Sequence, residues 1–503
     1  MHTVSTPTMA VLVVLGLLMA FMQVIDSSVG DHQTYTSYPP YVRGKNYIWV
    51  LNETDLSNSI SYLGSHSRLR AAITKLKSGN KIKVATIGGS ITAGQGAVDA
   101  PNWPQYLFNW LEDTYGKDII EGSNGAVSGT LSAYMSVCLN MHITKDVDIV
   151  FVEYSVNDWH LPGGPPFQNE MRRSFERLLR KILTYPHKPA VILVHSYIWY
   201  QAYPVPGSFW NNAEREFNEL ALYYHLPSVS LKACCYQHLA AEVPGFEVKT
   251  PRYKDSAVLK YRSFYYDQMH PDGNTGARVI AEMAMHMIKT AEEWLQIRPM
   301  TDKEVANVAL ALPAPMIQGN REAMADKCFI GNSFTQTVIL KQGFDWINEA
   351  NGNPRPKWGF VATKEGSVLK LEVDTRASTQ TGDTDEVLVE VAYLKSYENM
   401  GQAQVSCEAG CNCTPTTADG HQVERNSLLH LHNFYVTQAK ECHIVVRVLP
   451  TTNSGKHKFK LAGIMISEEA GQKEGIKNNG AVEFVGDISL LSKDGKFDVK
   501  NQI

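Results

Sequence analysis

Residues 81–96 constrain the fold more than any other part of this 503-residue sequence. The first half contains a β-branched run, residues 84–87, that predicts a buried strand, and the second half changes abruptly to glycine and small hydroxyl residues. Ser90 therefore stands just beyond the end of a strand. Because ligands bind beyond the carboxyl ends of the strands in an open α/β sheet, Ser90 is a candidate nucleophile.

This glycine-rich stretch differs from three well-known loop patterns. A phosphate-binding P-loop needs Lys and then Ser or Thr after Gly94, where Gln95 and Gly96 stand. A dinucleotide-binding loop needs glycine in place of Asp99, and the nucleophile elbow of α/β-hydrolases needs glycine in place of Thr92. All three patterns are excluded, which leaves an ordinary turn as the alternative to a catalytic serine.

The composition is that of a globular protein. Hydrophobic residues make up 44% of the chain and aromatic residues 10%, which is enough for two or three domains with packed cores. The 47 basic and 51 acidic residues leave a net charge of −4. We therefore expect neither nucleic acid nor an anionic membrane surface as a partner.

The first 30 residues predict a secretory signal peptide. Residues 9–25 form a nearly unbroken apolar run, and the small residues Ser28 and Gly30 provide a cleavage point after it. The run is just long enough to span a bilayer, so an uncleaved signal anchor is the alternative. We expect a secreted protein, and the alternative places it in the Golgi or anchors it in a membrane.

Eight cysteines behind a secretory signal predict disulfide bonds. They are Cys138, Cys234, Cys235, Cys328, Cys407, Cys411, Cys413 and Cys442. The last four, with the adjacent His443, offer a zinc site as an alternative, although the paired spacing of structural zinc modules is absent. Sequons at Asn52 and Asn412 predict glycosylation.

Strands and helices alternate between residues 81 and 297, which predicts a parallel sheet covered by helices on both faces. Expected strands are 84–87, 119–121, 148–154 and 190–194, and expected helices are 103–115, 171–183, 211–224 and 275–294. Residues 31–80 form an N-terminal extension before this domain. The Pro- and Ala-containing residues 298–325 predict a linker after it.

The C-terminal half shows the alternation of apolar and polar residues that is typical of β-strands. Alternating runs at residues 368–373, 386–391, 443–448 and 459–465 predict an all-β sandwich domain over residues 326–467. Residues 468–503 are rich in Gly and Lys and form a tail. The predicted architecture is therefore an α/β domain followed by a β-sandwich.

Four motifs at strand ends resemble, in their order, the motifs of the SGNH (GDSL-type) hydrolase family. They are Gly88-Gly89-Ser90-Ile91, residues 124–129, Val156-Asn157-Asp158 and Asp267-x-x-His270-Pro271. The resemblance covers about residues 81–295 and implies a flavodoxin-like, three-layer fold with a parallel sheet. Two residues depart from the family pattern, Gly89 in place of Asp and Ser155 in place of Gly, and both alter the loops that shape the pocket.

The resemblance also implies the catalytic roles. Ser90 is the expected nucleophile, His270 the base that takes its proton, and Asp267 the carboxylate that orients the imidazole. The oxyanion hole is expected from the N–H groups of Ser90 and Gly129 and the side-chain amide of Asn157. No metal or cofactor is implied. The alternatives are a turn-capping role for Asn157 and, for the Asp267–His270 pair, a helix cap with a surface histidine.

Further polar and aromatic residues stand near these motifs. We expect Asp158 to be structural. Four other side chains either line the pocket or serve core and surface roles, and the sequence leaves both alternatives open. They are Trp159, His160, His195 and Trp199.

Together, these features predict a secreted serine esterase that hydrolyses carboxylic esters through an acyl-enzyme. An aromatic-containing β domain beside an extracellular esterase indicates, by analogy, a carbohydrate substrate such as an O-acetylated glycan, with a lipid ester as the alternative. A secretory-pathway glycan O-acyltransferase and a non-catalytic glycan-binding protein are the rival functions. The intact set of Ser90, Asp267, His270 and Asn157 argues against the non-catalytic one.

Overall fold

The computed structural model describes residues 38–467, apart from positions 45, 159–166, 168–169, 203, 210–212, 255–256, 321–324, 351–356, 378–385, 424 and 426. The expected signal segment and the C-terminal tail lie outside the described residues. Within the described part, every helix is too short or too polar to cross a membrane.

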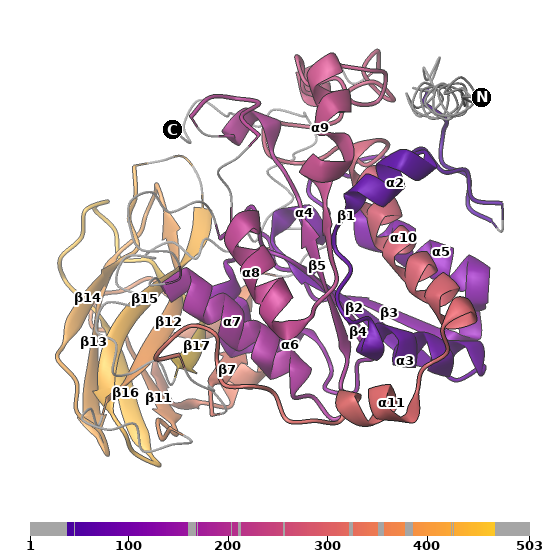
Figure 1. The fold of residues 1–503 in the computed structure, drawn as a ribbon. Coiled ribbons are helices and arrows are strands. Elements are labelled where there is room, and N and C mark those ends of the chain that lie inside the picture. Colours follow the sequence, from indigo (N-terminus) through magenta and orange to yellow (C-terminus); the bar gives the residue numbers. More distant parts are fainter. Residues whose placement is uncertain are drawn as a thin grey trace, which may run out of the picture.

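A six-stranded sheet forms the centre of the N-terminal domain, with the order β1-β6-β5-β4-β2-β3 (Figure 1). Its strands are β1 (Ile60–Tyr62), β2 (Ile82–Gly88), β3 (Ile120–Asn124), β4 (Ile149–Glu153), β5 (Ala190–His195) and β6 (Ser228–Ser230). Strands β2 to β6 are parallel and in flavodoxin-like order, as expected. Strand β1 pairs antiparallel with β6, so the sheet is mixed rather than purely parallel.

Helices cover both faces of this sheet and make a three-layer domain. One face packs against α2 (Glu53–Ser59), α3 (Ser67–Lys77), α5 (Trp103–Tyr115), α9 (Leu231–Ala241) and α10 (Gly276–Ile297). The other face packs against α6 (Ser132–His142), α7 (Glu170–Leu183) and α8 (Glu214–Tyr224). Alternation along β2 explains the two cores, because Val84 enters one and Ala85 the other. Short 3-10 helices lie at Lys117–Ile119, Trp199–Gln201 and Arg252–Lys254.

The segment before β2 is an integral part of the α/β domain. Besides supplying β1, it lies along α10, where the carboxylate of Glu282 accepts the backbone N–H groups of Val50 and Leu51 at 2.9 Å each. The neighbouring Arg278 donates to the carbonyl of Pro39 at 2.7 Å. Buried backbone groups before the first expected strand are thus satisfied by charged side chains of a helix more than 220 residues later.

The C-terminal domain consists of two antiparallel sheets, in agreement with the predicted all-β fold. Their orders are β15-β12-β17-β10-β9, with β7 also beside β17, and β14-β13-β16-β11-β8. The strands are β7 (Lys327–Ile330), β8 (Val338–Gln342), β9 (Asp345–Asn348), β10 (Trp358–Ala362), β11 (Val368–Val373), β12 (Glu386–Ser396), β13 (Gln402–Ala409), β14 (Thr416–Asp419), β15 (Ser427–Thr437), β16 (Cys442–Val448) and β17 (Phe459–Ser467). Their inward faces enclose a separate hydrophobic core.

The segment between the two domains runs along α7. It contains the short helix α11 (Asp302–Val308), and α12 (Asn332–Thr335) follows β7. Glu176 accepts the backbone N–H of Met316 at 2.5 Å, and Arg180 donates to the carbonyl of Pro313 at 2.7 Å. The expected linker is therefore attached to the α/β domain by charged side chains that bind its backbone.

The two domains also pack directly against each other through α6, α7 and the sheet that contains β7 and β17 (Figure 1). Ala392, Leu431 and Met465 of the sandwich belong to the same hydrophobic cluster as the buried side chains of α6 and α7. A disulfide joins Cys138 of α6 to Cys328 of β7. The interface is thus both apolar and covalently linked.

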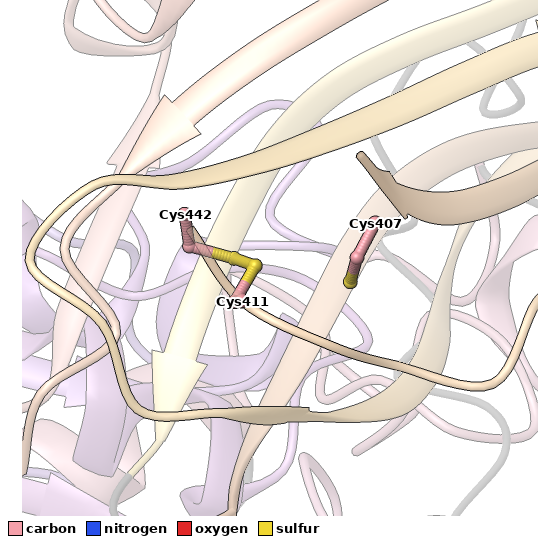
Figure 2. Close-up of side chains that lie close together, drawn as sticks. All are labelled: Cys407, Cys411 and Cys442. Atoms are coloured by element: carbon pink, nitrogen blue, oxygen red, sulfur yellow. A yellow bond between two sulfur atoms is a disulfide. The ribbon is translucent and has the colours of Figure 1, made fainter. Parts of the chain in front are cut away.

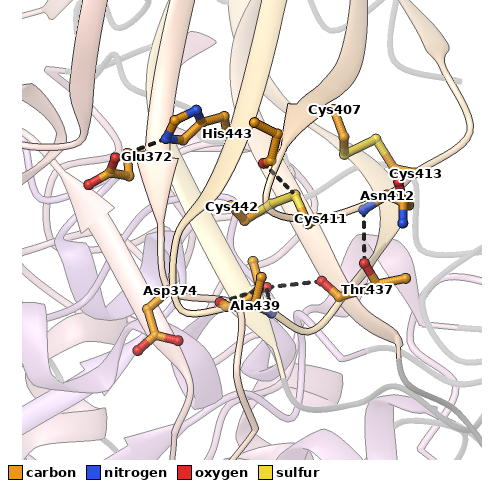
Figure 3. The surroundings of a disulfide bond; sticks show 12 residues. Glu372, Asp374, Cys407, Cys411, Asn412, Cys413, Thr437, Ala439, Cys442 and His443 are labelled. Atoms are coloured by element: carbon orange, nitrogen blue, oxygen red, sulfur yellow. Dashed lines mark hydrogen bonds and ion pairs between the residues drawn. A yellow bond between two sulfur atoms is a disulfide. The ribbon is translucent and has the colours of Figure 1, made fainter.

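All eight cysteines are paired in the structure. Besides the link between the domains, the pairs are Cys234–Cys235, Cys407–Cys413 and Cys411–Cys442. The sulfur atoms of Cys407, Cys411 and Cys442 lie within 4.8 Å of one another, as a metal site would require (Figure 2). All three sulfur atoms are nevertheless bonded in disulfides, and a disulfide sulfur is not the thiolate that binds zinc. His443 pairs with Glu372 at 2.9 Å (Figure 3), so the structure contradicts the zinc alternative.

An acidic side chain lies at the interface between the domains. Glu390 of β12 is buried and stands between Val389 and Val391, which face the sandwich core, so it points toward the α/β domain as Ala392 does. Burial and the nearby charge of Asp326, which itself pairs with Lys181 at 2.9 Å, raise the pKa of Glu390 to about 7. Glu390 is therefore protonated in the folded protein at mildly acidic pH.

We expect this carboxyl group to make stability depend on pH. The pKa of Glu390 in the folded protein lies above the ordinary value of 4.5. Its contribution to folding stability is therefore fully present below pH 4.5 and is lost as the pH rises through about 7. At about pH 8, Glu390→Gln should unfold at a higher temperature than the wild type, and its free energy of unfolding should be larger by an amount on the order of 1–3 kcal/mol. Glu386→Gln, on the same strand, is the control. An unchanged pH dependence in Glu390→Gln would contradict this assignment.

Candidate active site

Ser90 lies at the carboxyl edge of the central sheet, as the sequence predicts. Strand β2 ends at Gly88, and Ser90 is the first residue of the short helix α4 (Ser90–Ala93). The hydroxyl oxygen of Ser90 lies 2.9 Å from Nε2 of His270, although 180 residues separate the two in sequence. The first and last predicted motifs therefore meet in space.

Asp267 holds the other nitrogen of this histidine. Its carboxylate oxygens lie 2.8 and 3.0 Å from Nδ1 of His270, and one of them also accepts the backbone N–H groups of Met269 and His270 at 2.7 and 2.8 Å. Both side chains are buried. The surface-histidine alternative is therefore wrong, and the pair forms a continuous hydrogen-bonded series with Ser90.

The electrostatics of Asp267 favour its charged form. Burial alone would raise the pKa of this carboxyl group, but the His270 imidazole and the two backbone N–H groups lower it below its ordinary value. A charged carboxylate at Nδ1 requires that nitrogen to carry its hydrogen. Nε2 is then free to accept a proton from the hydroxyl group of Ser90.

Asn157 lies directly against the residue that precedes Ser90. A Cβ atom built on Gly89 would lie 2.2 Å from Oδ1 and 2.3 Å from Nδ2 of Asn157. Any side chain at position 89 would therefore displace this amide. The departure from the family pattern at Gly89 thus provides the space that Asn157 occupies.

Gly129 belongs to a loop attached to the end of β2. The N–H of Val127 donates to the carbonyl of Gly88 at 3.1 Å, and Gly129 has a φ of 73°, a conformation that glycine adopts without strain. Within the described part of the chain, the N–H groups of Ser90 and Gly129 and the amide of Asn157 have no protein acceptor. They are available as donors to a ligand.

Asp158 has the structural role expected for it. Its carboxylate accepts the backbone N–H of Ser132 at 2.8 Å and also the Ser132 hydroxyl, at the start of α6. Arg172 donates to its backbone carbonyl at 3.0 Å. Burial raises the pKa of Asp158 to about 6. The residue connects the loop that contains Asn157 to α6.

A hydrogen-bond network around the buried Thr92, two residues after Ser90, was not predicted from the sequence. The hydroxyl of Thr92 donates to Glu153, the last residue of β4, at 3.0 Å and accepts from the indole N–H of Trp103 at 3.2 Å. Asn124 donates to the carbonyl of Thr92 at 2.7 Å. Burial raises the pKa of Glu153 to about 7. The one available signal was a carboxylate at the end of an otherwise apolar strand.

The other candidate residues lie elsewhere or outside the described part. His195 is buried, with Nε2 3.2 Å from Oδ1 of Asn218, so it is a core histidine. Trp199 is half-buried and lies against Tyr236. Trp159 and His160 are among the residues that the structure does not describe.

Comparisons with known proteins agree with the fold. Residues 86–247 match the model of the GDSL-like lipase/acylhydrolase family. The fold resembles a two-domain esterase (CEX) active on acetylated mannans, co-crystallised with mannopentaose, with a TM-score of 0.57, 20% identity, and coverage of 82% of this chain and 98% of that one. A second structure of an esterase with the same description gives 19% identity and the same TM-score and coverage. No curated protein sequence matches the chain.

If the Asn157 amide donates to the oxyanion, Gly89→Ala should lower the rate of ester hydrolysis by about 100- to 1000-fold, the usual cost of losing one oxyanion donor. The added methyl group would displace the Asn157 amide, which lies 2.2 Å from that position. Steady-state kinetics should show the loss mainly in kcat. In an Asn157→Ala background the same substitution should cost little more, because the clash is gone. Equal losses in both backgrounds would contradict this explanation.

Proposed function

The α/β domain of this protein belongs to the GDSL-like lipase/acylhydrolase family, a family of ester hydrolases, and on that premise we propose that Ser90, His270 and Asp267 form its catalytic triad. The observation that supports this most directly is the 2.9 Å contact between Ser90 Oγ and His270 Nε2. The 2.8 Å contact between His270 Nδ1 and Asp267 completes the arrangement. This order of hydrogen bonds is the one that activates a serine hydroxyl.

The reaction proceeds in two stages. His270 Nε2 accepts the Ser90 proton while Oγ attacks the ester carbonyl carbon, and the resulting oxyanion accepts hydrogen bonds from the N–H groups of Ser90 and Gly129 and from the Asn157 amide. The tetrahedral intermediate collapses as His270 donates its proton to the departing alcohol. Water then attacks the acyl-enzyme with His270 as the base, and the carboxylic acid leaves as His270 returns that proton to Ser90 Oγ. Asp267 stabilises the imidazolium in both stages.

We further propose that the natural substrate is an O-acetylated glycan. The support is the likeness of both domains, over 82% of this chain, to an esterase active on acetylated mannans. Secretion is part of the proposal, because four disulfides are typical of proteins made in an oxidising compartment. The apolar run at residues 9–25 provides the export signal.

The triad predicts large, specific losses of activity. We expect Ser90→Ala and His270→Ala to lower kcat for p-nitrophenyl acetate by about 10⁴-fold or more, and Asp267→Asn by about 10⁴-fold. Ser123→Ala, at an exposed position of β3, should leave kcat unchanged. Thermal unfolding of each variant checks that the fold is intact. Wild-type turnover in a folded Ser90→Ala variant would disprove the assignment.

The substrate proposal predicts a preference for short acyl groups on sugars. Purified protein should release acetate from acetylated mannan, and Ser90→Ala should release none. On p-nitrophenyl esters, kcat/KM should fall as the acyl chain lengthens from acetate to octanoate. A preference for long acyl chains, with no acetate released from the polysaccharide, would point to a lipid ester and contradict the glycan assignment.

A further inference from the structure

A buried arginine outside the predicted motifs contacts both loops of the triad. Arg252 belongs to the 3-10 helix Arg252–Lys254 and is 3% exposed. One of the two loops follows Ser90 and reaches Asp99, and the other contains His270 and continues to Asp272. Arg252 is bound to both at once.

The guanidinium group bridges two carboxylates. Its Nη1 and Nη2 atoms donate to the two oxygens of Asp99 at 3.2 and 2.6 Å, and its Nε atom donates to Asp272. Such a forked contact fixes direction as well as distance, which a lysine cannot do. The side-chain amide of Asn274 lies between the same two carboxylates, 2.9 Å from Asp99 and 3.2 Å from Asp272.

Arg252 also contacts the other side of the turn that contains Asp267 and His270. Its backbone N–H donates to the carbonyl of Tyr265 at 3.0 Å, and its guanidinium carbon lies 5.2 Å from the centre of the Tyr266 ring. The turn itself is closed by the N–H of Tyr266, which donates to the carbonyl of His270 at 2.8 Å. The arginine thus holds the residues before and after the catalytic pair.

The two loops are packed without free space between them. A Cβ atom on Gly96, in the serine loop, would lie 2.5 Å from the carbonyl oxygen of Pro271 and 2.9 Å from Cβ of His270. Gly96 also accepts the N–H of Gly273 at 3.3 Å. A displacement of either loop therefore changes the distance between Ser90 and His270.

We propose that Arg252 is a positioning residue, whose bridge between Asp99 and Asp272 fixes His270 Nε2 within hydrogen-bonding distance of Ser90 Oγ. This role rests on the proposed function, since it concerns the geometry of that triad. Arg252 touches neither reacting atom. It acts through the two loops that carry them.

The test compares Arg252→Met with Lys260→Met. Lys260 also pairs with Asp99, at 3.1 Å, but is more exposed and makes no ion pair with Asp272, so it serves as the matched control. We expect Arg252→Met to lower kcat for p-nitrophenyl acetate by about 100-fold, the cost of misplacing reacting groups by about 1 Å, with KM changed little. Arg252→Lys should recover part of the loss, and Lys260→Met should resemble the wild type.

Two further measurements keep the test decisive. The far-downfield proton resonance of His270 Nδ1–H should shift or broaden in Arg252→Met and not in Lys260→Met. This measurement needs no turnover, so it decides the role of Arg252 even if the wild type hydrolyses no ester. Should Arg252→Met fail to fold, Arg252→Met/Asp272→Asn removes the buried unpaired carboxylate. Wild-type kcat and an unchanged resonance in a folded Arg252→Met or double variant would overturn the proposal.

Discussion

The hydrogen bond between His270 and Ser90 is the contact on which the function proposed for this protein depends. It joins residues 180 positions apart, so it forms only when β2 and the segment before α10 deliver their loops to the same edge of the sheet. Parallel strands bring such loops together because their carboxyl ends share one edge. Helix α10 follows the His270 loop. Its side chains Glu282 and Arg278 bind the backbone of the N-terminal segment, so that segment packs against the helix that supports this loop.

The two departures from the family pattern have separate structural reasons. At position 89, the absence of a side chain leaves the space that the amide of Asn157 occupies in this structure, 2.2 Å from the built Cβ. Ser155 is buried, and its hydroxyl donates to the carbonyl of Ser196 at 3.3 Å, which attaches the Asn157 loop to the end of β5. Both substitutions therefore act on the position of Asn157, the only side-chain donor proposed for the oxyanion.

Sequence alone predicted the parts of the site that lie within short, contiguous motifs. Asp267 and His270 are three residues apart, and Ser90 directly follows a β-branched run, so their positions could be read from the chain. Strand β1 was missed because its three residues, Ile-Ser-Tyr, are too few for an alternating pattern to stand out, and it is stabilised by pairing with β6. Arg252 and Glu153 were missed because their partners, Asp272 and Thr92, are distant in sequence and belong to no shared motif.

Helix α6 connects the sandwich to the candidate active site. Its first residue, Ser132, binds Asp158, which adjoins Asn157, and two turns later Cys138 forms the disulfide with Cys328 of the sandwich. Lys181 of α7 donates to the carbonyl of Ser136 on the same helix and pairs with Asp326 beside Glu390. The domain interface and the Asn157 loop are therefore connected through one helix, with the disulfide after its middle and the Asp158 contact at its first turn.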